Sequence, residues 1–342
     1  KQKTAYEIRP RDWSSDVCSS DLVSPFLTGS ALHLLAPGSG RSGTVAGGLG
    51  RFGASLETLA RKAGVSIRCE AKVAAIGLKR GRANALMLDR GEDIEARAIL
   101  STLDFKRTFL ELLDTEGNGG TPLPQAARFR IAGQMARVLI ALDAPPDLAF
   151  AHDDPDAAHG PIHVAGSLQA LNRTHDLWHA GTLDVAAPVT LRVPSLADPR
   201  LAPVGKATMT ATVSGVPARL FDGLWTDEKR AVVRDIALAA ADRASPGLSS
   251  RVLAACTVLP SDIEAELGAT AGDLDGGEIA PDQVFPFPCL GRDGAVWDGG
   301  RTPIRGLYVA GSCVAPSPFL LGAAGERAAR AVVADLSGRR LA

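Results

Sequence analysis

The chain has 342 residues, of which 46% are hydrophobic and 22% charged, and its 37 Lys and Arg residues against 38 Asp and Glu residues leave a net charge of -1. This balance gives no reason to expect a nucleic-acid partner, and the composition excludes both a disordered chain and a disulfide-rich scaffold. The five cysteines form no CxxC pair, so we expect the reducing environment of the cytoplasm. No run approaches the roughly 18 apolar residues that a membrane-spanning helix needs.

Residues 1–22 do not read as protein sequence. The segments KQKTAYEI and DWSSDVCSSDL resemble translations of the two ends of a short-read sequencing adapter, and Arg9, Pro10 and Arg11 fall where its variable index would lie. The alternative interpretation is a basic N-terminal arm that contains Trp13. We therefore leave this segment out of the fold prediction, and we expect the natural protein to continue upstream of Val23.

Residues 47–101 begin with a glycine cluster and continue with helix and strand patterns. Leu56, Leu59 and Ala63 recur on one face of a predicted helix. Short strands follow, with turns at Gly81 and at residues 90–91. The predicted strands cover residues 65–69, 72–78, 82–88 and 94–100. This region is typical of one βαβ-like unit followed by a small antiparallel meander.

The remaining chain continues with a mixed region and closes with a strand and a helix. Residues 104–280 contain strand patterns, a polar-faced helix over residues 226–244, and turn-dense segments without a repeat. The strand patterns cover residues 138–142, 162–168, 189–193 and 207–213. A strand is predicted over residues 306–310, followed by a glycine-bearing turn and a closing helix. We predict an α/β fold in which two halves of a nucleotide-binding-type lobe flank an inserted lobe.

The first glycine cluster fits the pattern G-x-G-x-x-G at Gly48, Gly50 and Gly53, and Glu70 follows 22 residues after Gly48. In a dinucleotide-binding loop such glycines allow close backbone approach to the pyrophosphate, and the acid binds the ribose hydroxyls. A buried strand should precede the first glycine, but only residues 44–46 separate Gly48 and its neighbour from Gly43. A glycine-rich turn without a ligand is therefore the alternative.

The C-terminal region contains a second candidate site. A hydrophobic strand ends at Gly311 and Ser312, and the next helix opens with the small residues 322–325, with no acid before Glu326. Backbone N–H groups at such a helix start can bind an anionic or electron-rich ligand. The alternative is that small residues simply permit close packing of helix and strand.

Several blocks of the chain resemble the phytoene desaturase-like flavoproteins, and most closely their pyridine nucleotide-disulfide oxidoreductase domain-containing branch. The blocks are GGLGRFGASLETLARKAGVSIRCEAKVAAI, AILSTLDFKRTFLELL, TPIRGLYVAGSCVAPSPFLLGAAGERAARAVV, PSLADPRLAPVGK and DGGEIAPDQVF. The resemblance implies a glutathione-reductase-type, Rossmann-like FAD-binding lobe over residues 23–103 and 282–342, without its first βαβ unit. It implies an inserted mixed α+β substrate lobe over residues 104–281.

The resemblance also implies which residues bind FAD. In this family the true G-x-G-x-x-G lies well upstream, and an internal pair such as Gly47 and Gly48 lines the flavin side of the cavity. Val73 would contact the adenine through its backbone. The pyrophosphate loop and its ribose-binding acid would then lie upstream of this sequence.

At the C-terminal end, the resemblance places Gly311 and Ser312 beside the pyrophosphate, and gives Gly322 and Ala323 as backbone donors to the pyrimidine edge of the flavin. Leu321 and Gly325 complete the predicted cofactor-binding set. Residues 315–319 read APSPF where this branch commonly carries HPGGG, so activity on the usual substrates is in doubt.

The implied activity is hydride transfer between a small, lipophilic substrate and flavin N5. No catalytic acid or base can be assigned. The alternatives are a carotenoid desaturase proper and a non-catalytic prenyl or lipid carrier that resembles the GDP-dissociation inhibitors. We expect a cytoplasmic protein with no nucleic-acid partner, and leave peripheral membrane contact and the oligomeric state open.

Three other features are given structural interpretations. His175 and His179 have the i, i+4 spacing of a metal pair, but no third ligand is evident, so we expect surface residues in a turn-rich segment and no metal. Cys313 lacks a partner at CxxC spacing and is expected to be a small buried thiol. Tyr308 is the only tyrosine after residue 22, which argues against the aromatic cage of an amine oxidase.

Overall fold

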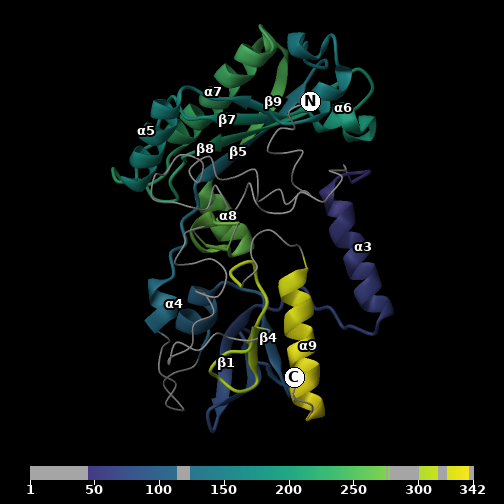
Figure 1. Ribbon diagram of the computed structural model, residues 1–342, viewed down its shortest axis with the longest axis vertical. Coiled ribbons are helices and arrows are strands. Elements are labelled where there is room, and N and C mark those ends of the chain that lie inside the picture. Colours follow the sequence, from purple (N-terminus) through teal and green to yellow (C-terminus); the bar gives the residue numbers. More distant parts are fainter. Residues whose placement is uncertain (1–44, 114–123, 275, 278–299, 315–321, 339–342) are drawn as a thin grey trace. The chain divides into compact units, whose positions relative to one another are not determined.

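The computed structural model describes residues 45–113, 124–274, 276–277, 300–314 and 322–338 (Figure 1). The predicted adapter-like segment 1–22 and the departure at residues 315–319 lie outside these ranges. The chain divides into two compact units, of which unit 1 comprises Lys1–Ile67 and Gly133–Gly272. Unit 2 comprises Arg68–Ala132 and Asp273–Ala342. The predicted α/β class is confirmed, because both units combine helices with strands.

Unit 1 contains an antiparallel sheet of five strands in the order β6-β7-β8-β5-β9. Its strands are β5 (Met135–Leu142), β6 (Ile162–Val164), β7 (Val189–Arg192), β8 (Ala207–Ser214) and β9 (Val252–Val258). Four of them confirm predicted strands, although β6 ends earlier than the predicted residue 168. Strand β9 was not predicted.

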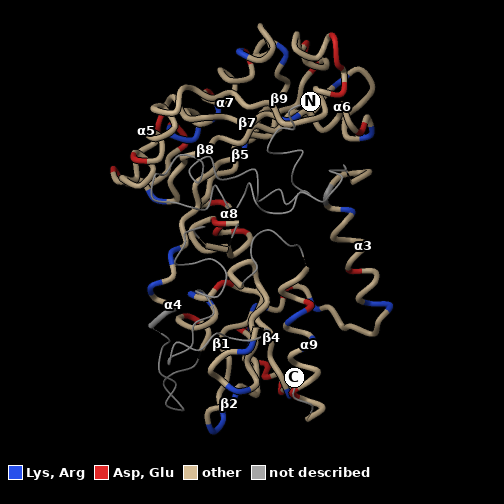
Figure 2. Tube along the Cα trace, viewed as in Figure 1, with Lys and Arg blue, Asp and Glu red and all other residues tan. Residues whose placement is uncertain are grey.

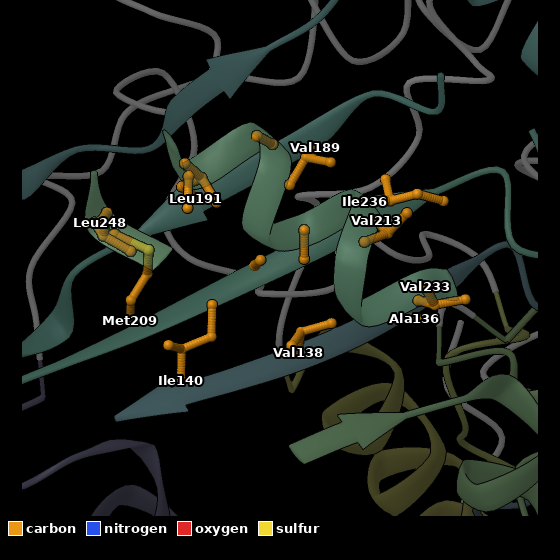
Figure 3. Close-up of a cluster of buried hydrophobic side chains, with 14 of the residues drawn as sticks. Ala136, Val138, Ile140, Val189, Leu191, Met209, Val213, Val233, Ile236 and Leu248 are labelled. Atoms are coloured by element: carbon orange, nitrogen blue, oxygen red, sulfur yellow. The ribbon is translucent and has the colours of Figure 1, made fainter. Parts of the chain in front are cut away.

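The sheet packs one face against helix α7 (Asp227–Ala244), and this contact forms the larger core of the protein (Figures 1 and 3). Because side chains alternate along a strand, Ala136, Val138 and Ile140 all point to the same face, where they meet the helix. Val233 and Ile236 of α7 are buried there. The helix confirms the pattern over residues 226–244, and Thr226 caps its first turn by accepting a hydrogen bond from the Lys229 N–H.

The other helices among the described residues of unit 1 are α3 (Leu49–Lys62), α5 (Leu168–His179), α6 (Pro194–Ala197) and α8 (Pro260–Leu267). Short 3-10 turns are η3 (Ala149–Ala151), η4 (Pro155–His159), η5 (Pro199–Leu201), η6 (Leu248–Arg251) and η7 (Thr270–Gly272). Helix α5 corrects the prediction of a turn-rich segment: the Ser167 hydroxyl accepts a hydrogen bond from the Ala170 N–H, so a helix begins at Leu168, where the predicted strand ends and turns were expected to follow.

Helix α3 is confirmed, but the strand predicted over residues 65–69 is wrong. The Val65 N–H donates to the Ala60 carbonyl oxygen and so ends the helix, and the next residues pair with no strand among the described residues. A β-branched run forms a strand only where a neighbouring strand completes its hydrogen bonds.

Unit 2 combines a meander with a short parallel pair. Strands β1 (Val73–Lys79), β2 (Arg82–Leu88) and β3 (Asp93–Glu95) form the predicted antiparallel meander. Strand β4 (Ile99–Ser101) pairs in parallel with β10 (Leu307–Val309). The single strand predicted over residues 94–100 is therefore divided, because β3 pairs with β2 while β4 changes partner. The helices are α4 (Pro124–Arg128), the π-helix η2 (Arg107–Glu111) and α9 (Ala323–Ser337).

Basic and acidic residues are interspersed along the described elements of each unit, as the blue and red segments of the trace show (Figure 2). This agrees with the near-zero net charge. Among the described residues, none of the helices combines the length and the apolar composition that crossing a membrane requires.

Candidate functional site

The parallel pair in unit 2 brings two segments distant in sequence to one edge. Leu307 lies opposite Ile99 and Val309 opposite Ser101, and the Ala310 N–H donates to the Ser101 carbonyl oxygen at 2.8 Å. Because the strands run in the same direction, residues 102–104 and 310–312 both leave the sheet at its carboxyl edge. Ligands of open α/β sheets bind at such edges.

Gly311 is buried at this edge, and its missing side chain is explained by packing. A Cβ atom on Gly311 would lie 2.6 Å from the Thr102 carbonyl oxygen, closer than real Cβ atoms approach. The Val314 N–H donates to the Gly311 carbonyl oxygen at 3.1 Å and closes a turn. Ser312 is exposed, and the backbone of Gly276 lies against it. Gly276 belongs to the DGGEIAPDQVF block, and no local pattern in the sequence indicates its contact with Ser312.

Helix α9 begins with backbone donors and open space. Gly322 precedes it in a left-handed conformation with φ of 85°, and the first bond within the helix runs from the Glu326 N–H to the Gly322 carbonyl oxygen. The N–H groups of residues 323–325 therefore have no acceptor inside the helix. No described atom lies within 4 Å of a Cβ built on Gly322 or Gly325. Leu321, which was predicted beside them, lies outside the described residues.

The other end of α9 is fixed to strand β10. The Asp335 carboxylate accepts from Arg301 Nε at 2.9 Å and from the Tyr308 hydroxyl at 2.8 Å. Burial, with a contribution from Asp335, raises the pKa of Tyr308 to about 12. Ala328 and Ala331 are buried, so small side chains let the helix approach its neighbours closely. The direction of the helix start is thus set by contacts at its far end.

Cys313 is confirmed as a buried thiol, only 3% exposed, with its Sγ 3.8 Å from the Leu103 carbonyl oxygen. Val73, predicted to contact adenine, is the half-buried first residue of β1 and lies opposite Leu88. With Gly311, Ser312 and the start of α9, it belongs to unit 2.

Gly47 and Gly48 belong to unit 1, where they form the turn before α3. The Gly48 N–H donates to the Val45 carbonyl oxygen at 2.9 Å, and both glycines have positive φ, 83° and 91°. The Gly47 N–H donates to Asp198 Oδ2 at 2.6 Å. Nothing in the local sequence pattern around Gly47 indicates this contact, because Asp198 is 151 positions away.

Asp198 is itself held by a guanidinium group. Arg200 Nε lies 2.8 Å from Asp198 Oδ1, and Arg200 Nη2 lies 2.9 Å from Oδ2. Arg200, followed by the Gly47 N–H, holds the pKa of Asp198 well below its ordinary value. The carboxylate is therefore ionised at neutral pH.

The histidine pair lies on α5, with its two Nε2 atoms 3.2 Å apart. The Trp178 indole N–H donates to the Gly133 carbonyl oxygen at 3.1 Å and anchors the same helix. Across the described ranges, no group of three or more His, Cys, Asp or Glu side chains is arranged to hold a metal ion.

No protein-family model matches the chain. The chain is 27% identical to pyridine nucleotide-disulfide oxidoreductase domain-containing protein 2 of Rattus norvegicus over 338 residues, which cover 94% of this chain and 58% of the rat protein. The Mus musculus protein of the same name matches with the same identity and coverage.

Among solved structures, a putrescine oxidase variant aligns with 84% of this chain and 53% of its own, at 14% identity and a TM-score of 0.49. The chain thus spans little more than half the length of the curated relatives it matches, and it is similar to oxidoreductase domain-containing proteins over nearly its whole length.

Proposed function

We propose that the protein is an FAD-dependent oxidoreductase of the phytoene desaturase-like kind that transfers hydride between a small lipophilic substrate and the flavin. The observation that carries the proposal is the start of α9, where the first backbone N–H groups have no acceptor inside the helix and no described atom lies near a Cβ built on Gly322 or Gly325. This helix follows β10 in the chain, and β10 ends at the same edge as its parallel partner β4. The likeness to oxidoreductase domain-containing relatives over 94% of the chain supports it.

The residues at this edge fit the chemistry of FAD. The cofactor carries an anionic pyrophosphate and a flavin ring whose pyrimidine edge has carbonyl acceptors, and a helix start supplies N–H donors and a favourable dipole. Among the described residues, no neighbouring side chain lies within 4 Å of a Cβ built on Gly322 or Gly325. Gly311 would contact the cofactor only through its backbone, because Thr102 fills the space on its Cα.

We assign the cofactor contacts of unit 2 to Val73, Gly311, Ser312, Leu321, Gly322, Ala323 and Gly325. The cofactor role of Gly47 and Gly48 in unit 1 stays a prediction. FAD, when bound, supplies the hydride acceptor. The N–H groups at α9 bind and orient the ring, and the Asp335 contacts keep α9 in place.

The direct test uses the complete open reading frame that contains this chain, because the chain covers 58% of the length of its relatives. We expect a purified protein with the visible absorbance of bound flavin. A colourless protein that cannot be loaded with FAD would refute the proposal and favour the lipid carrier. Coloured products after incubation with phytoene would identify a carotenoid desaturase proper.

A single substitution tests the site at α9. Gly325 lies inside the helix with open space around its Cα, so Gly325→Leu should fold normally and place a side chain in the cofactor's position. We expect the affinity for FAD to fall at least about tenfold, with thermal stability unchanged or raised, because Leu favours a helix by roughly 1 kcal/mol over Gly. Ala329→Leu, at an exposed position of the same helix, is the control and should leave FAD affinity unchanged.

A further inference from the structure

His175 and His179 lie on one face of a regular helix, although the sequence predicted a turn-rich segment there. Helix α5 ends at His179, and the i, i+4 spacing makes the two side chains neighbours. Their Nε2 atoms are 3.2 Å apart, and their ring centroids are 4.4 Å apart. The two nitrogens are thus nearer to each other than the ring centres are, and they face a common point at the helix surface.

The separation of the two nitrogens matches that of two ligands on one metal ion. Imidazole nitrogens bind Zn²⁺ at about 2.0–2.1 Å, so two of them on one ion lie about 2.9–3.3 Å apart at bond angles between the square-planar and tetrahedral values. The observed 3.2 Å lies in this range. An ion can therefore replace the direct contact between the imidazoles without a change in the helix.

Both imidazole rings pack against the same indole. The centroid of the Trp178 ring lies 5.9 Å from that of His175 and 4.5 Å from that of His179. Trp178 is only 8% exposed, and its N–H donates to the Gly133 carbonyl oxygen at 3.1 Å, which fixes the indole. The His175 side chain is itself 12% exposed. The pair therefore loses less conformational freedom on binding than two mobile surface side chains would lose.

The electrostatic surroundings favour a cation. The pair lies at the C-terminal end of α5, where the helix dipole favours positive charge. Asp176 Oδ1 lies 3.8 Å from His175 Nδ1. A carboxylate on this side of the ring favours a proton on Nδ1, which leaves the Nε2 lone pair for a metal ion.

We propose that His175 and His179 bind a divalent transition-metal ion of the kind that prefers imidazole, such as Zn²⁺ or Cu²⁺. The described ranges contain no group of three metal-ligating side chains, so the remaining coordination positions are left to water. Mg²⁺ prefers oxygen ligands and should not bind this pair. The inference is independent of the proposed function, because neither histidine is assigned to the cofactor.

The experiment titrates the purified protein, produced from the complete open reading frame without a polyhistidine tag, with Zn²⁺ and with Mg²⁺ by calorimetry. Electron paramagnetic resonance of the Cu²⁺-loaded protein reports how many nitrogens bind the ion. His179→Gln removes the exposed ligand. The double variant His179→Gln/Ala180→His keeps the number of histidines but moves the second one to i, i+5, off the shared face. His163→Gln, at an exposed histidine of β6 in the same unit, is the control.

We expect His179→Gln and the double variant to bind Zn²⁺ at least about tenfold more weakly than wild type, since even the loss of a group that only supports a ligand weakens metal binding about 10–100-fold. The Cu²⁺ spectrum should show two ligand nitrogens in wild type and fewer in both variants. His163→Gln should match wild type, and circular dichroism checks that each variant is folded. Equal Zn²⁺ affinity in wild type and the two His179 variants overturns the proposal. The same loss in His163→Gln as in His179→Gln, or equal binding of Mg²⁺ and Zn²⁺ by wild type, also overturns it.

Discussion

Gly311 and Gly325 are both assigned to the cofactor site, yet the structure predicts opposite effects when each is replaced by alanine. At Gly311 the new Cβ would lie 2.6 Å from the Thr102 carbonyl oxygen, below the 3.0 Å that real Cβ atoms keep. At Gly325 it would meet no described atom within 4 Å. Neither glycine has a left-handed φ, so contact, not backbone strain, decides the outcome.

The magnitudes follow from these distances. Overpacking against rigid backbone lowers the free energy of unfolding by about 2–3 kcal/mol. Alanine also reduces the conformational entropy of the unfolded chain, which raises the free energy of unfolding by about 0.4–1 kcal/mol. Gly311→Ala should therefore destabilise the protein by about 1–2.5 kcal/mol. Gly325→Ala lies inside α9 and should stabilise it by about 0.5–1 kcal/mol. The two variants should differ by about 1.5–3.5 kcal/mol.

Urea unfolding of the FAD-free protein, followed by circular dichroism, measures this difference without any contribution from the cofactor. If Gly311→Ala proved as stable as Gly325→Ala, the reasoning would fail, and the glycine at 311 would have to be explained by the ligand rather than by Thr102. A loss of FAD affinity in Gly311→Ala without a loss of stability would support the same conclusion.

Two further predictions concern the cores of the units. Leu191→Ala should destabilise unit 1 by about 2–5 kcal/mol because Leu191 is fully buried, whereas Leu253→Ala, at a position 60% exposed, should cost less than about 0.5 kcal/mol; equal midpoints in chemical unfolding would contradict the packing. Tyr308 has a pKa raised to about 12, above its unfolded value of about 10, so it binds its proton more tightly when folded. The stability that this pKa shift contributes is fully present below about pH 10 and is lost as the pH rises toward 12. The free energy of unfolding of Tyr308→Phe should therefore fall less over that pH range than that of the wild type.

The local sequence pattern was sufficient to predict elements that bury one face against the core. The alternation of Val138 and Ile140, and the helical spacing over residues 226–244, each describe one buried face, and both elements are present. The strand over residues 65–69 failed because composition shows that a segment can be extended and does not show whether a neighbour pairs with it.

The candidate site also has some features that the sequence predicts and others that depend on contacts between distant segments. Small residues at Gly311 and at residues 322–325 could be read from the sequence, but the pattern does not distinguish a glycine held by packing from one that leaves open space. That distinction depends on Thr102, which approaches Gly311 through the pairing of β4 with β10. Asp198 could not be assigned at all, because its partner lies 151 positions away.

The strand order of unit 1 has a consequence for how the protein is made. Strand β5 lies between β8 and β9 in the sheet, but both neighbours follow it in the chain, and Leu142 and Val252 are 110 positions apart. At 5–20 residues per second, a ribosome needs on the order of 10 s to synthesise that interval. During this time β5 has an apolar face and at least one unpaired edge, the combination that favours pairing with another chain. The nascent chain should therefore depend most on chaperones between the synthesis of β5 and that of β9.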